Sequence, residues 1–94
     1  MSMPYLKPNF REELEAVTDL RNTSRYMATL KDEDFAGAIN YYNHVICKNF
    51  IETKGIKYWR LALVVGTLFL TILELVRRVV NPYEDKKIKE NGDV

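Results

Sequence analysis

The pattern of apolar and polar positions predicts helices along most of the chain. In the first segment, apolar side chains recur at steps of three and four, at Phe10, Leu14, Val17 and Leu20. Asn9 is a suitable N-cap for this helix, and the carboxylates of its first turn suit the helix dipole. The stretch 18–30 is less regular, because the polar residues at 22–24 could form either a break or a new helix cap before the apolar residues that follow. We therefore expect a short first helix and leave both alternatives open for this stretch.

A second helix is predicted from about residue 33 to Thr53. It begins after an acidic run at 32–34, where negative charge favours a helix N-terminus. Its apolar stripe consists of Phe35, Ile39, Tyr42, Ile46 and Phe50. Gly55 follows the last periodic position and suits the left-handed conformation that ends many helices. The opposite face is polar, so this helix is expected to be amphipathic.

The third predicted helix, from near Ile56 to Val80, is apolar nearly all round. Its segment 61–73 has thirteen residues without a charge, which is shorter than the roughly 20 apolar residues that a membrane-spanning helix needs. A small soluble chain must cover more than one face of such a helix, and a second copy of the chain is a natural cover. We expect a homo-oligomer whose interface contains Trp59, Leu63, Gly66 and Leu70.

Prolines mark the two ends of the chain. Pro4 and Pro8 disfavour a helix at 1–8 and predict an extended arm. Asn81-Pro82 pairs a capping residue with a proline suited to the first helical position, which predicts a new short helix within the 81–94 segment. No repeat or linker divides the chain. The predicted fold is a single all-α domain, 1–94, built as a bundle of three main helices and a short fourth.

Composition narrows the classes of function. Lysine and arginine number 14 against 13 acidic residues, so the net charge of +1 provides no bulk attraction to a nucleic acid polymer. Cys47 is the only cysteine and the N-terminus lacks the pattern of a secretory signal, which favours a cytoplasmic protein. One histidine and one cysteine do not make a zinc site, and the acidic run lacks calcium-loop spacing. We expect no metal, no cofactor and no catalytic residue.

Two polar clusters are candidate ligand sites. Arg77 and Arg78 offer bidentate donors to phosphate, and Tyr83 follows them as an aromatic that could stack on a base. The alternative is that these cations suit a helix C-terminus and that Arg78 pairs with Glu74. The second cluster lies on the second helix and could donate hydrogen bonds, the alternative being a solvated face; its members are Asn40, Asn43 and His44.

The segment 74–94, ELVRRVVNPYEDKKIKENGDV, carries a resemblance to a known group. It resembles the close of a family of small uncharacterised phage and bacterial proteins that end in a phrase like RRVVxPYEDKKIKENGDV. The likeness extends more weakly to 3–8 and to 39–41 with Cys47. Relatives are more polar in the third helix. The resemblance implies a small helical protein that a phage produces in the cytoplasm of an infected bacterial host.

Three functional hypotheses follow. The first is a non-catalytic phage binding protein that sequesters a small anionic, nucleotide-derived defence signal. In it Arg77 and Arg78 contact phosphate, Tyr83 stacks on the base, and the amide and imidazole cluster supplies hydrogen bonds. Its warrant is analogy with other compact phage oligomers. The second is a structural or adaptor protein that binds a host or phage protein through the apolar helix. The third is a membrane-associated protein, against which the charges of Arg60 and Glu74 argue.

Overall fold

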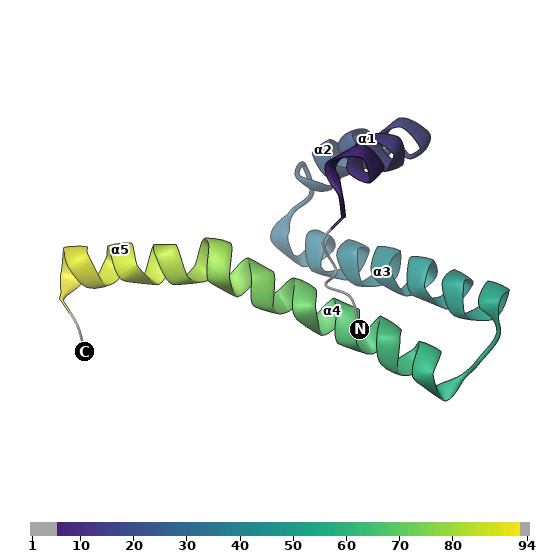
Figure 1. Cartoon of the computed structure of the whole chain (residues 1–94). Helices are drawn as coiled ribbons and strands as arrows, with labels where there is room; N and C mark the ends of the chain where they lie inside the picture. The colour runs from purple at the N-terminus through teal and green to yellow at the C-terminus, as the bar shows by residue number, and fades with distance from the viewer. Residues whose placement is uncertain (1–5, 93–94) are drawn as a thin grey trace. The chain divides into compact units, whose positions relative to one another are not determined.

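The computed structural model describes residues 6–92, and these residues form helices with no strand among them (Figure 1). The predicted all-α class is confirmed. The chain divides into two compact units, Met1–Ile56 and Lys57–Val94. Most of the predicted extended arm, residues 1–5, lies outside the described part of the chain.

Helix α1, Pro8–Val17, begins one residue before the predicted N-cap. Lys7 is the N-cap instead of Asn9, and its carbonyl accepts hydrogen bonds from the backbone N–H groups of Phe10 and Arg11, both at 3.0 Å. Pro8 therefore belongs to the helix rather than to the arm. A proline is tolerated there because its fixed φ is helical and the first-turn N–H it lacks would have no partner within the helix.

Helix α2, Leu20–Met27, occupies the stretch for which the sequence left a break and a new cap open. Residues 22–24 form neither a break nor a cap, and the polar side chain of Asn22 makes hydrogen bonds along the helix surface. Asn22 Nδ2 donates to Asp19 Oδ1 at 2.8 Å, and Arg25 Nη1 donates to Asn22 Oδ1 at 2.8 Å. Asparagine side chains that bond their neighbours in this way need not interrupt a helix. The apolar side of α2 packs on α3.

Helix α3, Asp32–Lys54, agrees with the predicted second helix. Its first turn contains Asp32, Glu33 and Asp34, as expected for the positive end of the helix dipole. Gly55 ends it with φ 99°, and the Gly55 N–H donates to the Ile51 carbonyl at 2.8 Å. The predicted role of this glycine is confirmed, because a positive φ is costly for residues with a Cβ.

The second unit is one continuous helix of 34 residues, Tyr58–Asn91, drawn in green to yellow in Figure 1. It consists of α4, Tyr58–Leu75, a π-helical turn, Val76–Val80, and α5, Asn81–Asn91. Gly92, with φ 81°, ends it, and its N–H donates to the Ile88 carbonyl at 2.8 Å. The predicted new helix start at Asn81 is therefore wrong, whereas the predicted end at Asn91-Gly92 is confirmed.

The π turn explains how the helix continues through Pro82. Proline lacks an N–H, and its ring clashes with the carbonyl four residues earlier in a regular α-helix. Here the Asn81 N–H donates to the Val76 carbonyl, five residues earlier. A turn closed by such a bond is wider than an α-helical turn and is a recognised site of local adjustment. The helix adjusts its turn before the proline instead of ending there.

Among residues 6–92 the structure has no fully buried side chain. The second unit is a single helix, and a single helix has no other element of its own unit against which to pack its apolar residues. One row of large apolar side chains, exposed by 38 to 67%, runs along it: Leu61, Val65, Leu68, Ile72, Leu75 and Val79. We call these six residues the exposed row. Their exposure leaves an apolar face that needs a partner.

Candidate functional site

The predicted arginine site lies where α4 meets the π turn. Arg78 Nε donates to Glu74 Oε2 at 2.8 Å, and Arg77 Nη2 donates to the same oxygen at 3.0 Å. The predicted alternative, pairing of Arg78 with Glu74, is confirmed. The two guanidinium side chains remain 63% and 64% exposed. Two cations share one carboxylate, so these three side chains together keep a positive charge.

Tyr83 lies beyond the π turn, on α5, and its side chain is exposed. The Lys87 ammonium lies 5.5 Å from the centre of its ring, and this ammonium also pairs with Glu90 at 3.2 Å. The ring face that was expected to stack on a base therefore has a cation beside it. Arg77, Arg78 and Tyr83 share one helix, but the π turn separates the arginine–glutamate contacts from the tyrosine–lysine contact.

The second predicted cluster lies on α3, in the other unit. Asn40 and His44 are exposed there. His44 lines a shallow depression with Tyr41 and Lys48, and Lys48 pairs with Glu52 at 3.9 Å. Asn43 instead lines a hollow toward α2. The cluster belongs to the first unit and the arginines belong to the second.

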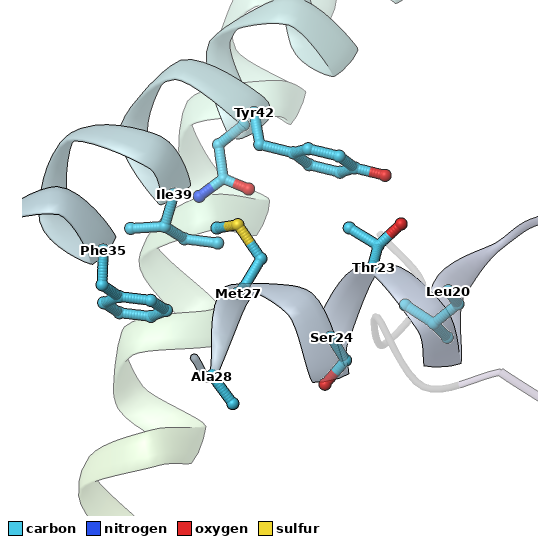
Figure 2. A pocket seen from close by; sticks show the side chains of 9 residues that line it. Leu20, Thr23, Ser24, Met27, Ala28, Phe35, Ile39 and Tyr42 are labelled. Atoms are coloured by element: carbon cyan, nitrogen blue, oxygen red, sulfur yellow. The ribbon is translucent and has the colours of Figure 1, made fainter. Parts of the chain in front are cut away.

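The hollow between α2 and α3, with a volume of about 480 Å³, was missed by sequence reasoning. Figure 2 shows Met27 extending from α2 toward Ile39 of α3. The wall is mainly apolar, with three hydroxyls, one amide and no charged side chain; its residues are Leu20, Thr23, Ser24, Met27, Ala28, Phe35, Ile39, Tyr42 and Asn43. Such a wall suits an apolar group rather than a phosphate. Leu20 and Met27 lie two helical turns apart, and this spacing is the sequence pattern from which an apolar side of α2 could have been predicted.

The predicted oligomer interface and the exposed row lie on different sides of α4. Leu63, Gly66 and Leu70 are half-buried. Trp59 is exposed, and the Arg60 guanidinium lies 4.5 Å from the centre of its ring, within the range of a cation–π contact. The structure leaves Val76 half-buried and exposes Leu75 and Val79 more strongly.

One ion pair in the first unit changes a pKa. Arg21 lies beside Glu15, and its Nη2 donates to Glu15 Oε2 at 3.2 Å. The hydrogen bond and the positive charge lower the pKa of Glu15, and the same contact raises the pKa of Arg21. Both groups are exposed, so the pair is a surface feature. Within residues 6–92 no group of three histidine, cysteine, aspartate or glutamate side chains could hold a metal.

The model of a family described as a domain of unknown function (DUF6899) matches residues 3–94. The chain belongs to the DUF6899 family. The match includes the C-terminal segment on which the predicted resemblance to an uncharacterised family rests. No curated protein and no solved structure matches the chain. Membership of DUF6899 assigns no activity, so the function of this chain has to be argued from its surfaces.

The long helix of this DUF6899 chain also bears on the membrane hypothesis. By length and composition alone, Tyr58–Asn91 is apolar enough to cross a membrane. Core helices of soluble proteins meet the same two criteria. The uncharged segment 61–73 extends only about 20 Å along a helix, compared with about 30 Å of hydrocarbon in a bilayer. Glu74 and the arginines that pair with it lie directly after this segment. None of the apolar window is buried in the described structure, so length and composition leave a membrane span open.

Proposed function

We propose that this protein is a non-catalytic adaptor or structural protein that binds another protein chain through the exposed row of its long helix. The observation that supports this proposal is the exposure of six large apolar side chains, at 38 to 67%, on a helix that forms its unit alone. Contiguous apolar surface of this kind marks an interaction site in a soluble protein. The surface is a helix face, so the mode of binding is helix against helix or helix in groove.

Covering this row gives the binding its driving force. Removal of apolar surface from water contributes about 25 cal/mol per Å². Large apolar side chains at the centre of an interface dominate its affinity, and truncation of one such residue costs on the order of 2 to 4 kcal/mol. Ile72 lies near the middle of the row and is 55% exposed. We assign it the central place in the contact.

The test compares two substitutions one position apart on the same helix. Ile72→Asp places a charge in the exposed row, whereas Leu73→Asp places the same charge on an exposed apolar residue outside it. The unsubstituted protein, purified without detergent, should sediment as a protein complex heavier than the 11.0 kDa chain. Ile72→Asp should weaken this complex by about 100-fold or more, and Leu73→Asp by less than about 5-fold. Helical circular dichroism of both variants establishes that they fold.

Equal effects of the two substitutions would remove the exposed row from the proposal. A protein that stays monomeric at high concentration, or that remains dispersed only in detergent, would contradict protein binding altogether. The detergent result would favour association of the helix with lipid.

A second candidate is sequestration of a small anionic, nucleotide-derived signal by a cytoplasmic homo-oligomer of phage origin. It is favoured by one observation, the positive charge that remains where Arg77 and Arg78 share Glu74. The test is mass analysis of small molecules released when the purified protein is denatured. A nucleotide released from the unsubstituted protein and lost from the Arg77→Ala, Arg78→Ala double variant would support this candidate. Equal release from both would exclude the arginines as its binding groups.

A further inference from the structure

The exposed row repeats every seven residues. Its steps alternate between four and three, from Leu61 to Val79, which is the spacing of the two core positions, a and d, of a coiled coil. Within the six residues of the exposed row, the residue types separate between the two positions. One position holds only the β-branched residues Val65, Ile72 and Val79, and the other holds only leucine, at 61, 68 and 75.

This separation distinguishes between pairings of two helices. When two identical helices run parallel and in register, each core residue packs beside its own copy. Every layer then contains either two β-branched residues or two leucines. In an antiparallel pair the two positions face each other, so the classes mix and the separation has no use. β-branched residues at a and leucine at d favour parallel two-stranded coiled coils.

Charge follows the same pattern. Between Tyr58 and Val79 the chain has four charged residues, namely Arg60, Glu74, Arg77 and Arg78. In the heptad that places Val65 at a, Arg60 and Glu74 are at c and Arg77 is at f, on the outside of a coiled coil. Arg78 is at g, beside the seam, where its guanidinium pairs with Glu74 of the same helix. A pairing through the exposed row therefore places no charge at an a or d position.

The exposed row is long enough to form a short coiled coil. Tyr58, which is 89% exposed, takes the a position three residues before Leu61. From Tyr58 to Val79 the repeat extends for just over three heptads, or about 32 Å of helix. Apolar a and d positions sustained over about three to four heptads, together with charges at e and g, are the usual signature of a coiled coil. The a and d repeat is present here, whereas between Tyr58 and Val79 the e and g positions hold uncharged residues except for Arg78.

The π turn extends the row beyond this point. A strict heptad count would place Pro82 at the next d position. Because a turn closed by a bond to the fifth residue holds one extra residue, the turn at Val76–Val80 shifts the following positions by one. Tyr83, an exposed aromatic, takes the place that Pro82 would have had.

We propose that the exposed row is the seam of a parallel, in-register, two-stranded coiled coil formed by two copies of this chain. The proposal rests on the proposed function, in which this row binds protein, and it names the partner and its orientation. It places the interface on a different side of the helix from the one predicted from sequence at Leu63, Gly66 and Leu70.

Disulfide trapping tests both the surface and the orientation. Cys47→Ser first removes the native thiol, which is half-buried on α3. Single cysteines are then introduced as Val65→Cys and Leu75→Cys in the row, and as Leu70→Cys outside it. A disulfide needs Cα atoms within about 7 Å. In a parallel pair each row cysteine lies opposite its own copy, whereas residues 65 and 75 are separated by about 15 Å along the axis.

The proposal predicts that Val65→Cys and Leu75→Cys each form disulfide-linked dimers under mild oxidation, with a yield at least about 10-fold above that of Leu70→Cys. A mixture of the two row variants, one of them tagged, should give almost no mixed dimer. Sedimentation of the reduced proteins should give twice the 11.0 kDa chain mass. Mixed dimers between Val65→Cys and Leu75→Cys, with little self-linkage, would show an antiparallel pair and overturn the proposed orientation.

The remaining outcomes separate this proposal from the proposed function. Linkage through Leu70→Cys alone would place the interface on the other face and overturn the seam, while leaving protein binding by the helix intact. A further outcome is that the chain forms no homodimer but binds a different protein, and that Ile72→Asp disrupts this complex. That result would overturn the second copy as the partner and retain the adaptor function. A monomer in detergent-free buffer would overturn both.

Discussion

The backbone N–H of Asn81 donates to the carbonyl of Val76, five residues earlier, and Pro82 follows immediately. This single bond marks a wider turn in the middle of a helix that extends from Tyr58 to Asn91. The proline consequently lies inside a continuous helix, not at the start of a new one. Continuity matters for function because it keeps the exposed row and the α5 segment on one rigid element.

Replacement of Pro82 by alanine should stabilise the helix. Alanine restores the missing N–H and removes the ring that disfavours a regular α-helix, so the free energy of unfolding should rise by about 1 to 3 kcal/mol. Thermal unfolding followed by circular dichroism measures the change. Pro8→Ala is the matched control, since Pro8 occupies the first turn of α1, where proline is tolerated. A loss of stability in Pro82→Ala would indicate that the proline begins a separate helix.

The Glu74 carboxylate pairs with two arginines. Replacing it therefore tests how much these ion pairs stabilise the fold and, separately, whether they weaken the binding of an anion. Glu74→Gln should lower the free energy of unfolding by less than about 1 kcal/mol, because both partners are exposed to solvent. The same change removes the carboxylate that competes with an anion, and should tighten binding of inorganic pyrophosphate several-fold in a calorimetric titration. Glu52→Gln, which removes the partner of Lys48 on α3, is the control. If the two variants bind pyrophosphate equally, the arginine cluster is not an anion site.

Gly66 tests which face of α4 is in close contact with another helix. A Cβ at Gly66 would meet nothing within 4 Å in the chain itself, and the same holds for Gly37 on α3. Gly→Ala in a helix interior gains roughly 0.5 to 1 kcal/mol, so both Gly66→Ala and Gly37→Ala should stabilise the protein and leave its native mass unchanged. Dissociation of the assembly by Gly66→Ala alone would instead place the interface on the Leu63, Gly66 and Leu70 face.

The Glu15 and Arg21 pair predicts a pH dependence in the first unit. Because the pKa of Glu15 is lowered in the folded chain, its contribution to stability is fully present above the ordinary pKa of glutamate, about 4.3. It is lost as the pH falls through the lowered pKa. A carboxyl titration by NMR should show Glu15 titrating below the ordinary range of glutamate, and Arg21→Gln should return it to that range. An unchanged Glu15 titration in Arg21→Gln would remove the arginine as the cause.

Local signals in the sequence predicted the long amphipathic helix well. The apolar stripe from Phe35 to Phe50 predicted α3, and Gly55 adopts the positive φ expected where that helix ends. The pairing of Arg78 with Glu74 followed from helical spacing alone. These features depend on residues within one or two turns of each other, and such relationships are readable without a fold.

The missed features share a different cause. Asn22 can break a helix or bond along its surface, and only its partners Asp19 and Arg25 decide between the two. Proline after asparagine suits both a helix start and the exit of a π turn, so Pro82 was ambiguous. The six predicted ligand residues were grouped by chemistry, and whether they form one site depends on tertiary contacts that residue spacing does not encode. Three of them belong to each unit, so this grouping stays a prediction.

The most direct test of the account is native mass spectrometry of the unsubstituted protein, purified without detergent, before and after denaturation. The account predicts a complex built only of protein chains, with a mass of twice 11.0 kDa if the partner is a second copy. Denaturation should release no small molecule. A monomer of 11.0 kDa would contradict protein binding through the exposed row, and a complex with a nucleotide-sized excess mass would transfer the function to anion sequestration.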